Sequence, residues 1–130
     1  AELDVDPLEL EEVRKGVVAV AQEPGGTAYW RRSREVLMAG KTGTAQVVRL
    51  GTTRLKAEET AYFERDHAWF VAYAPIEDPQ IVVAVINEHS GHGGSKAAPI
   101  AVRVIDAWYR LKQERAQIAA AASGQGGEKL

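Results

Sequence analysis

The sequence predicts an α+β fold in which helices cover an antiparallel sheet. Two segments, near 7–22 and 95–114, repeat apolar residues at helical spacing, and three segments between them, near 36–49, 67–75 and 80–88, have the composition of strands. The last two strands are separated only by a short turn with two prolines, which favours an antiparallel hairpin. The order helix, strand, strand, strand, helix indicates helices packed on one sheet.

The first helix has a clear start and a clear end. Asp6 is a residue type that caps helices, Pro7 suits the first helical position, and Glu9 stands three residues after Asp6 as in a capping box. The segment 24–26, Pro-Gly-Gly, ends the helix. Between these limits apolar residues recur three and four apart, at Leu10, Val13, Val17, Val20 and Ala21.

The three strands differ in composition. The first, Val36 to Val48, contains several small residues, which weaken a strand unless another backbone or a ligand must come close. The run from Ile81 to Ile86 is continuously apolar, so we expect the last strand to be buried on both faces. The charged segment from Leu50 to Asp66 is expected to be a loop, with room for a helical turn. We expect four aromatic residues to lie in the core: Trp69, Phe70, Tyr73 and Trp108.

A glycine-rich loop from Glu88 to Ser95 precedes the last helix. Ser95 is expected to cap this helix, and Pro99 falls in its first turn, where a missing N–H costs little. The expected inner face consists of Ala101, Val104, Ile105, Trp108 and Leu111. We assign residues 1–115 to the domain and the Ala/Gly/Ser-rich residues 116–130 to a flexible tail.

Composition excludes several classes of protein. The chain has 130 residues, 45% apolar and 26% charged, which fits one globular domain or a piece of one. Lys+Arg 16 against Asp+Glu 18 gives a net charge of −2, unlike a dedicated nucleic-acid binder. No apolar run reaches the ~18 residues that span a bilayer. The absence of cysteine excludes disulfides, Cys-ligated zinc and thiol catalysis.

The chemistry is concentrated in Lys41-Thr42-Gly43-Thr44, within the first strand. This string places a cation beside two hydroxyls, which suits a substrate carboxylate. The glycine lets a substrate approach the strand edge, and a free backbone N–H there can face a developing oxyanion. These four residues by themselves also fit a strand lysine next to a bulge glycine. Assigning them to an active site therefore depends on the sequence segments around them.

The surroundings carry a resemblance to a known family. Ala45-Gln46-Val47 follows the string, Gly26-Thr27-Ala28 precedes it, and the strand from Asp66 to Pro75 comes about 25 residues after it. In order and spacing these segments, from about Val13 to Leu111, resemble the C-terminal part of the transpeptidase domain of class B penicillin-binding proteins, above all the elongation-specific branch. The resemblance implies the C-terminal portion of the β-lactamase/transpeptidase-like fold.

The resemblance also implies roles for individual residues. Lys41 would keep the site positive and contact the hydroxyl of a Ser-x-Asn motif, and Thr42 and Thr44 would hold the carboxylate of the substrate or β-lactam. Gly43 would leave room for the substrate, and the Thr44 N–H would be one oxyanion donor. In this family a serine attacks D-Ala-D-Ala, releases D-Ala and passes the acyl group to a neighbouring stem-peptide amine. No cofactor and no metal are implied.

Two further motifs of the family are absent from the sequence. None of the four serines, Ser33, Ser90, Ser95 and Ser123, has a lysine three residues later, so Ser-x-x-Lys does not occur. Val85 stands two residues before Asn87, the only asparagine, so Ser-x-Asn does not occur either. We therefore expect a C-terminal fragment of a longer enzyme, inactive alone, whose last strand has an open edge.

The resemblance implies peptidoglycan stem peptides and β-lactams as ligands. The expected protein partners are the rest of the same polypeptide and cell-elongation membrane proteins, and no nucleic acid is expected. The expected location is the periplasmic face of the bacterial inner membrane. The alternative from another class is a non-catalytic transpeptidase-like module for protein interaction in the cell envelope. A Ser-x-x-Lys upstream would favour the enzyme.

Other candidate sites are weaker. Glu88, His89 and His92 cluster in one loop, but a zinc site needs three or four ligands with supporting contacts, so a solvated loop is expected. The glycine-rich start of the last helix lacks a Walker lysine pattern, so nucleotide binding is not expected. We expect His67, at the start of a strand, to make a structural hydrogen bond.

Overall fold

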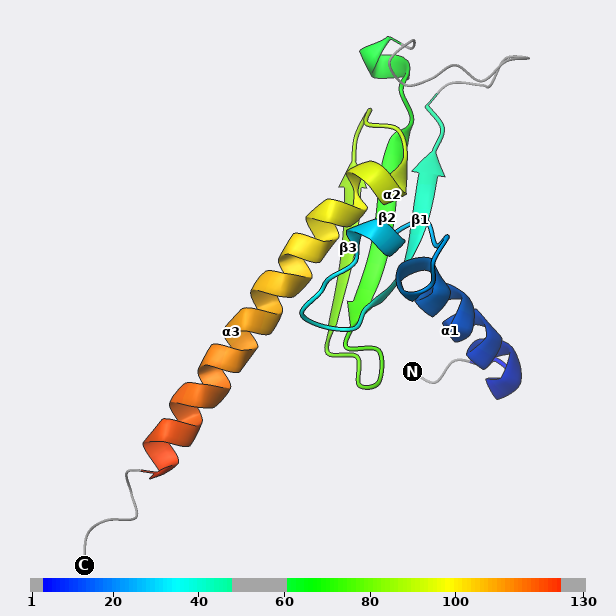
Figure 1. Ribbon diagram of the computed structural model, residues 1–130. Helices are drawn as coiled ribbons and strands as arrows, with labels where there is room; N and C mark the ends of the chain where they lie inside the picture. The colour runs from blue at the N-terminus through cyan, green and yellow to red at the C-terminus, as the bar shows by residue number, and fades with distance from the viewer. Residues whose placement is uncertain (1–3, 48–60, 125–130) are drawn as a thin grey trace, which may run out of the picture.

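The computed structural model describes residues 4–47 and 61–124. Within them, three strands form one antiparallel sheet in the order β1-β2-β3: β1 is Ala39–Ala45, β2 is His67–Ala74 and β3 is Ile81–Asn87. The helices are α1 (Pro7–Gln22), α2 (Gly93–Lys96) and α3 (Ala98–Gly124), with single 3-10 turns η1 (Tyr29–Arg31) and η3 (Tyr62–Glu64) (Figure 1). The predicted α+β fold class and the β2–β3 hairpin are confirmed.

Helix α1 forms where its capping residues predict it. The Leu8 N–H donates to the Asp6 side chain at 2.7 Å, and Pro7 occupies the first helical position. After Gln22 the chain turns through Gly25, whose φ of +96° is a conformation that glycine adopts without strain. Only Ala21 of this helix is fully buried, because one stripe alone faces the sheet.

The sheet buries one face and leaves the other open. Along β2 the exposed fraction alternates: Phe70 is 0% exposed, whereas Trp69 is 38% exposed. On β3 the same open face carries Val82 at 70% exposure. The predictions that Ile81–Ile86 is buried on both faces and that Trp69 lies in the core are therefore wrong. In the part of the chain that the structure describes, the core lies on one face, which the helices cover, and Tyr73 and Trp108 are half-buried.

The first strand is shorter than predicted. It begins at Ala39 rather than Val36, because the Ser33 hydroxyl accepts the N–H groups of Glu35 and Val36 at 3.0 and 3.1 Å and holds this segment in a turn. At its other end the strand stops at Ala45. Val48 and most of the predicted loop lie outside the described residues; the part that is described contains η3.

The last helix starts later and runs further than predicted. Residues 93–96 form the separate turn α2, so Ser95 is not the cap; its hydroxyl donates to the His92 carbonyl at 3.2 Å. Pro99 does lie in the first turn of α3. The helix reaches Gly124, so residues 116–124, assigned above to the flexible tail, are helical, while 125–130 lie outside the described residues.

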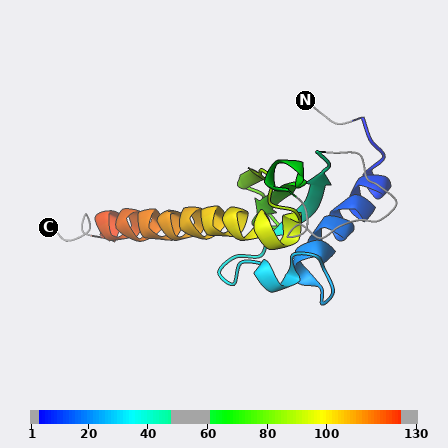
Figure 2. The ribbon, with the colours of Figure 1, turned by 90° about the horizontal axis from the view of Figure 1, so that it is seen from above.

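Helix α3 projects away from the sheet (Figure 2). Ala101 and Ile105 are fully buried against the core, but Val104 and Leu111, predicted for the inner face, are 45% and 53% exposed. From residue 110 to residue 123 the side chains are exposed. The sheet is too short to cover a helix of this length, so sequence periodicity overestimates the buried face. No helix in the described ranges is long and apolar enough to cross a membrane.

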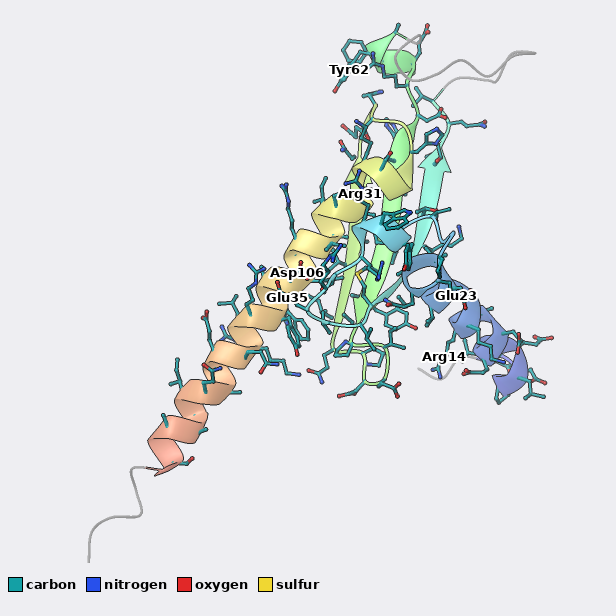
Figure 3. All side chains as sticks on the ribbon, in the orientation of Figure 1. Arg14, Glu23, Arg31, Glu35, Tyr62 and Asp106 are labelled. Carbon is teal, nitrogen blue, oxygen red and sulfur yellow. The ribbon has the colours of Figure 1, made fainter. Side chains whose placement is uncertain are left out.

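One ion pair ties α3 to the loop before β1. The Arg110 guanidinium donates from Nε to both Glu35 carboxylate oxygens, at 3.1 and 2.9 Å, and a second nitrogen, Nη2, also contacts this carboxylate. Figure 3 shows Glu35 beside α3. The hydrogen bonds from Arg110, together with its charge, lower the pKa of Glu35 from its ordinary value. This bidentate contact joins residues 75 positions apart along the chain.

Candidate functional site

The Lys-Thr-Gly-Thr string lies on the edge strand of the described sheet. In β1, Lys41 pairs with Val71, Thr42 with Phe70, Gly43 with Trp69 and Thr44 with Ala68. Since β1 pairs only with β2 among the described strands, no described strand pairs with its other edge, although α1 also packs on β1. Lys41 and Thr44 are exposed, and Thr42 and Gly43 are half-buried. A peptide could therefore lie along this edge and pair with the backbone.

A cleft of about 450 Å³ opens beside this edge. Thr42 and Thr44 point to the face of the sheet that packs on the helices, as strand alternation requires. The Thr27 hydroxyl lies 3.1 Å from the Thr42 hydroxyl, so the loop after α1 contributes a third hydroxyl to the site. The full lining consists of Thr27, Thr42, Gly43, Thr44, His92, Gly93, Gly94 and Ser95.

Glycines let helix α2 sit directly on the strand. A Cβ at Gly93 would overlap the Trp69 carbonyl oxygen and lie 2.7 Å from the Gly43 oxygen, and one at Gly94 would overlap the Thr27 carbonyl oxygen. No side chain fits at either position without displacing backbone. The Gly-Gly pair thus brings the 92–95 segment against β1 and makes the wall of the cleft opposite the strand.

The lysine of the string lies outside the lining of the cleft. Its Nζ donates to the Thr42 carbonyl oxygen at 2.8 Å, and its side chain is exposed. Because it is one residue away from Thr42, it projects to the other face of the sheet and must reach around the edge to meet a ligand. The site thus combines one cation with two strand hydroxyls, a set of groups that suits an anionic ligand.

Sequence reasoning missed the far wall of the cleft. In the sequence, Thr27 belongs only to the segments that carry the resemblance, and the pattern around His92 and the Gly93-Gly94 pair predicts only a loop. The signal was present, because two glycines at the start of a helix indicate a close approach of backbones. What the pattern does not reveal is which strand they approach.

Two other candidate sites from the sequence are His67 and the loop that contains Glu88, His89 and His92. His67 makes the structural hydrogen bond that was predicted: its Nδ1 accepts the His89 N–H at 3.0 Å. The Glu88, His89 and His92 loop forms no group of three or more metal-ligating side chains within residues 4–47 and 61–124. His89 instead packs its ring against other aromatic rings.

An edge strand that carries a cation and two threonines, faced by a glycine-seated helical turn, is an arrangement that suits an extended peptide at a sheet edge. Residues 1–106 match the family model of the penicillin binding protein transpeptidase domain. The chain belongs to this family.

Named relatives share this segment with the chain. A peptidoglycan D,D-transpeptidase MrdA from Haemophilus influenzae is 44% identical over 108 residues, which are 78% of this chain and 15% of the relative. The MrdA protein of Escherichia coli is 39% identical over 82 residues, 62% of this chain and 13% of that protein. The chain therefore spans about 15% of the length of the curated relatives it matches.

Solved structures agree in fold. A Helicobacter pylori complex of penicillin-binding protein 2 (PBP2) with MreC superposes with a TM-score of 0.68 at 32% identity, over 82% of this chain and 19% of that one. Pseudomonas aeruginosa PBP2 in complex with WCK 5153 gives a TM-score of 0.64 at 38% identity, over 83% of this chain and 21% of that one. The resemblance and the transpeptidase-like fold inferred from the sequence are confirmed.

Proposed function

We propose that this chain is the Lys-Thr-Gly part of a PBP2-like peptidoglycan D,D-transpeptidase. The longer enzyme cross-links stem peptides: a serine attacks the D-Ala-D-Ala carbonyl, D-Ala leaves, and an amine of a neighbouring peptide takes the acyl group and frees the serine. The observation that carries the proposal is the open β1 edge, with its cleft, in a chain that matches the transpeptidase domain. The named relatives favour an enzyme over a non-catalytic module.

The residues of the string take separate roles. Thr42 and Thr44, which line the cleft, hold the substrate carboxylate through their hydroxyls. Lys41 supplies the positive charge beside them and contacts the serine hydroxyl of the Ser-x-Asn motif. Gly43 lacks a side chain, so a substrate backbone can approach the strand. A Cβ there would lie 3.2 Å from the Trp69 Cβ on the open face.

The Thr44 N–H is the proposed oxyanion donor. The Thr42 carbonyl accepts from Lys41 Nζ, which supports an outward direction for that carbonyl. In an antiparallel pair both backbone groups of a residue face the same side, and residues two apart behave alike. On this argument Thr44 presents its N–H to the open edge, where a substrate carbonyl would accept it.

Amide hydrogen exchange on the purified chain tests this direction. We expect the Thr42 and Thr44 amides to exchange quickly, and the Lys41 and Gly43 amides, which would bond to β2, to exchange at least about tenfold more slowly. NMR exchange spectra measure all four in one sample. If the Thr44 amide exchanges as slowly as that of Gly43, its N–H is bonded within the sheet and cannot be the oxyanion donor. The string would then be an ordinary interior strand that contains a glycine.

A fluorescent penicillin tests the proposed function itself. The 130-residue chain alone should not label, because it has no Ser-x-x-Lys. A chimera in which these residues replace the matching segment of the Haemophilus influenzae relative should label, because that segment is 44% identical over 108 residues. Stoichiometric labelling of the isolated chain, or a folded chimera that does not label, would contradict the proposal.

The same proposal gives the setting of the enzyme. We place it at the periplasmic face of the inner membrane, where peptidoglycan stem peptides and β-lactams are reached. Its proposed partners are the remainder of the transpeptidase polypeptide and membrane proteins of cell elongation. The Helicobacter pylori PBP2 structure, solved as a complex with MreC, supports a partner of this kind.

A further inference from the structure

Four aromatic rings gather at one end of the sheet, beyond the cleft. The His89 ring lies at the centre, with centroid distances of 4.6 Å to His67, 5.2 Å to Tyr62 and 5.6 Å to Phe63. Tyr62 and Phe63 also meet edge to face at 5.2 Å. We call these four residues the aromatic cluster. It brings together η3, the start of β2 and the loop after β3.

Hydrogen bonds fix the centre of the cluster. The His89 N–H donates to His67 Nδ1 at 3.0 Å, and the His89 ring Nδ1 lies 3.3 Å from the Arg65 carbonyl oxygen. The Gly91 N–H donates to the Asp66 carbonyl oxygen at 2.9 Å. His89 itself has a φ of +50°, unusual for a residue other than glycine. The loop after β3 is therefore held against the start of β2, and the His89 ring has a fixed position.

The outer rings of the cluster face solvent. Tyr62 is 55% exposed and Phe63 is 76% exposed, although both pack on His89. Figure 3 shows Tyr62 on the segment beyond the end of the sheet. Exposed aromatic rings held on a fixed support are typical of a binding surface rather than of a core.

The cluster lies past the end of the Lys-Thr-Gly-Thr string. His67 pairs with Ala45, the residue after Thr44, so it lies about one strand spacing, ~4.8 Å, across from the end of the string. His89 and His92 belong to the same short loop, and His92 lines the cleft. By strand alternation His67 lies on the open face with Trp69, whereas Thr42 and Thr44 face the helices, so the cluster lies at the end of the sheet rather than inside the cleft. A ligand that runs along β1 beyond Thr44 would meet the cluster at this end.

We propose that the aromatic cluster binds a sugar ring of the glycan strand whose stem peptide lies in the cleft. This inference rests on the proposed function. A stem peptide of five residues spans at most about 17 Å when extended, so its sugar stays close to the reacting end. The C–H face of a sugar ring packs on an aromatic face, whereas the anionic peptide is matched by Lys41 and the threonines.

A β-1,4-linked tetramer of N-acetylglucosamine is the probe. We expect the purified 130-residue chain to bind it, and the double variant Tyr62→Leu/Phe63→Leu to bind it about tenfold more weakly, because leucine keeps apolar volume but lacks a flat ring. Phe63→Trp keeps a ring and should bind at least as well as the original chain. Ligand-observed NMR and calorimetric titration measure both affinities.

Trp30→Leu is the matched control. Trp30 is 83% exposed and meets Tyr29 edge to face, outside the cluster, so its loss should leave binding of the tetramer unchanged. Circular dichroism checks that each variant is folded. An original chain that does not bind the tetramer, or a Tyr62→Leu/Phe63→Leu variant that binds it as well as the original chain, would overturn the proposal.

Two measurements distinguish this inference from the proposed function: acylation by penicillin and the binding of a sugar-free stem pentapeptide. In the chimera with the Haemophilus influenzae relative, the double variant Tyr62→Leu/Phe63→Leu should leave acylation by penicillin unchanged, since penicillin carries no sugar. If the chimera does not acylate while the tetramer still binds through the aromatic rings, the proposed function fails and the sugar site stands. If the double variant Tyr62→Leu/Phe63→Leu weakens binding of the pentapeptide as much as binding of the tetramer, the cluster is a peptide site and the inference is wrong.

Discussion

Lys41→Ala is expected to slow acylation of the chimera by a fluorescent penicillin about a hundredfold or more. Lys41 supplies the positive charge next to the two threonines of β1, and removal of one group that stabilises charge in a transition state typically costs 10²–10³-fold in rate. Stopped-flow labelling over a range of penicillin concentrations separates the acylation rate from binding. Lys41→Arg keeps the positive charge but not the shape of the lysine side chain. Its acylation rate should therefore lie between those of the parent chimera and Lys41→Ala.

Lys15→Ala serves as the control for this result. Lys15 lies on α1, pairs with Glu12 at 2.7 Å, and lies outside the lining of the cleft. The Lys15→Ala substitution removes one positive charge from the chain, as Lys41→Ala does, but leaves the charge at the site in place. The Lys15→Ala chimera should therefore acylate at the same rate as the parent chimera. Equal rates for Lys41→Ala and the parent chimera would show that the strand lysine does not take part, and the role proposed for Lys41 would be withdrawn.

Gly93→Ala is expected to destabilise the chain by about 1–3 kcal/mol or more, because overpacked sites force the backbone to shift. The added Cβ would overlap the Trp69 carbonyl oxygen and crowd Gly43, both of which are backbone groups in the sheet. The whole α2 turn would have to move off β1. Urea unfolding followed by circular dichroism should show a lower midpoint with an unchanged slope.

Gly16→Ala is the matched control, with the opposite expected sign. A Cβ at Gly16 meets no atom within 4 Å, and the residue lies inside α1, where alanine is favoured over glycine by about 1 kcal/mol. The two glycine-to-alanine changes should therefore move the midpoint in opposite directions. A Gly93→Ala chain as stable as the parent would mean that α2 does not sit on β1 as described, and the wall of the cleft would be lost.

Local patterns predicted the elements of this protein well where the determining contacts are local. The Asp6 cap and Pro7 act within one turn, so the start of α1 could be predicted from four residues. The β2–β3 hairpin follows from two apolar runs and the prolines between them. The Lys-Thr-Gly string is predicted to lie within a strand between Val36 and Val48, in spite of its glycine, and it lies on β1.

Predictions of burial and of strand bounds were wrong where they depend on which part of the fold packs against a residue. The continuous apolar run of β3 suggested two covered faces, but the described helices cover one, so Val82 is 70% exposed. The periodicity of α3 could not show where the sheet beneath it ends, so Leu111 was assigned to a buried face that it does not have. The Ser33 hydroxyl shortened β1 by capturing two N–H groups that a strand would have used.

By itself, the sequence determined the class of fold, the family and the strand that carries the chemistry, because capping, periodicity and motif spacing act between residues near one another in the chain. Only the tertiary structure decided that β1 is an edge of the sheet that the described residues form and that Gly93 and Gly94 seat a helical turn on it. It also brought Thr27 to the site and built the aromatic cluster from three separate segments. Those features depend on contacts between distant residues, which fix the position of each segment only when the whole sheet and its helices pack together.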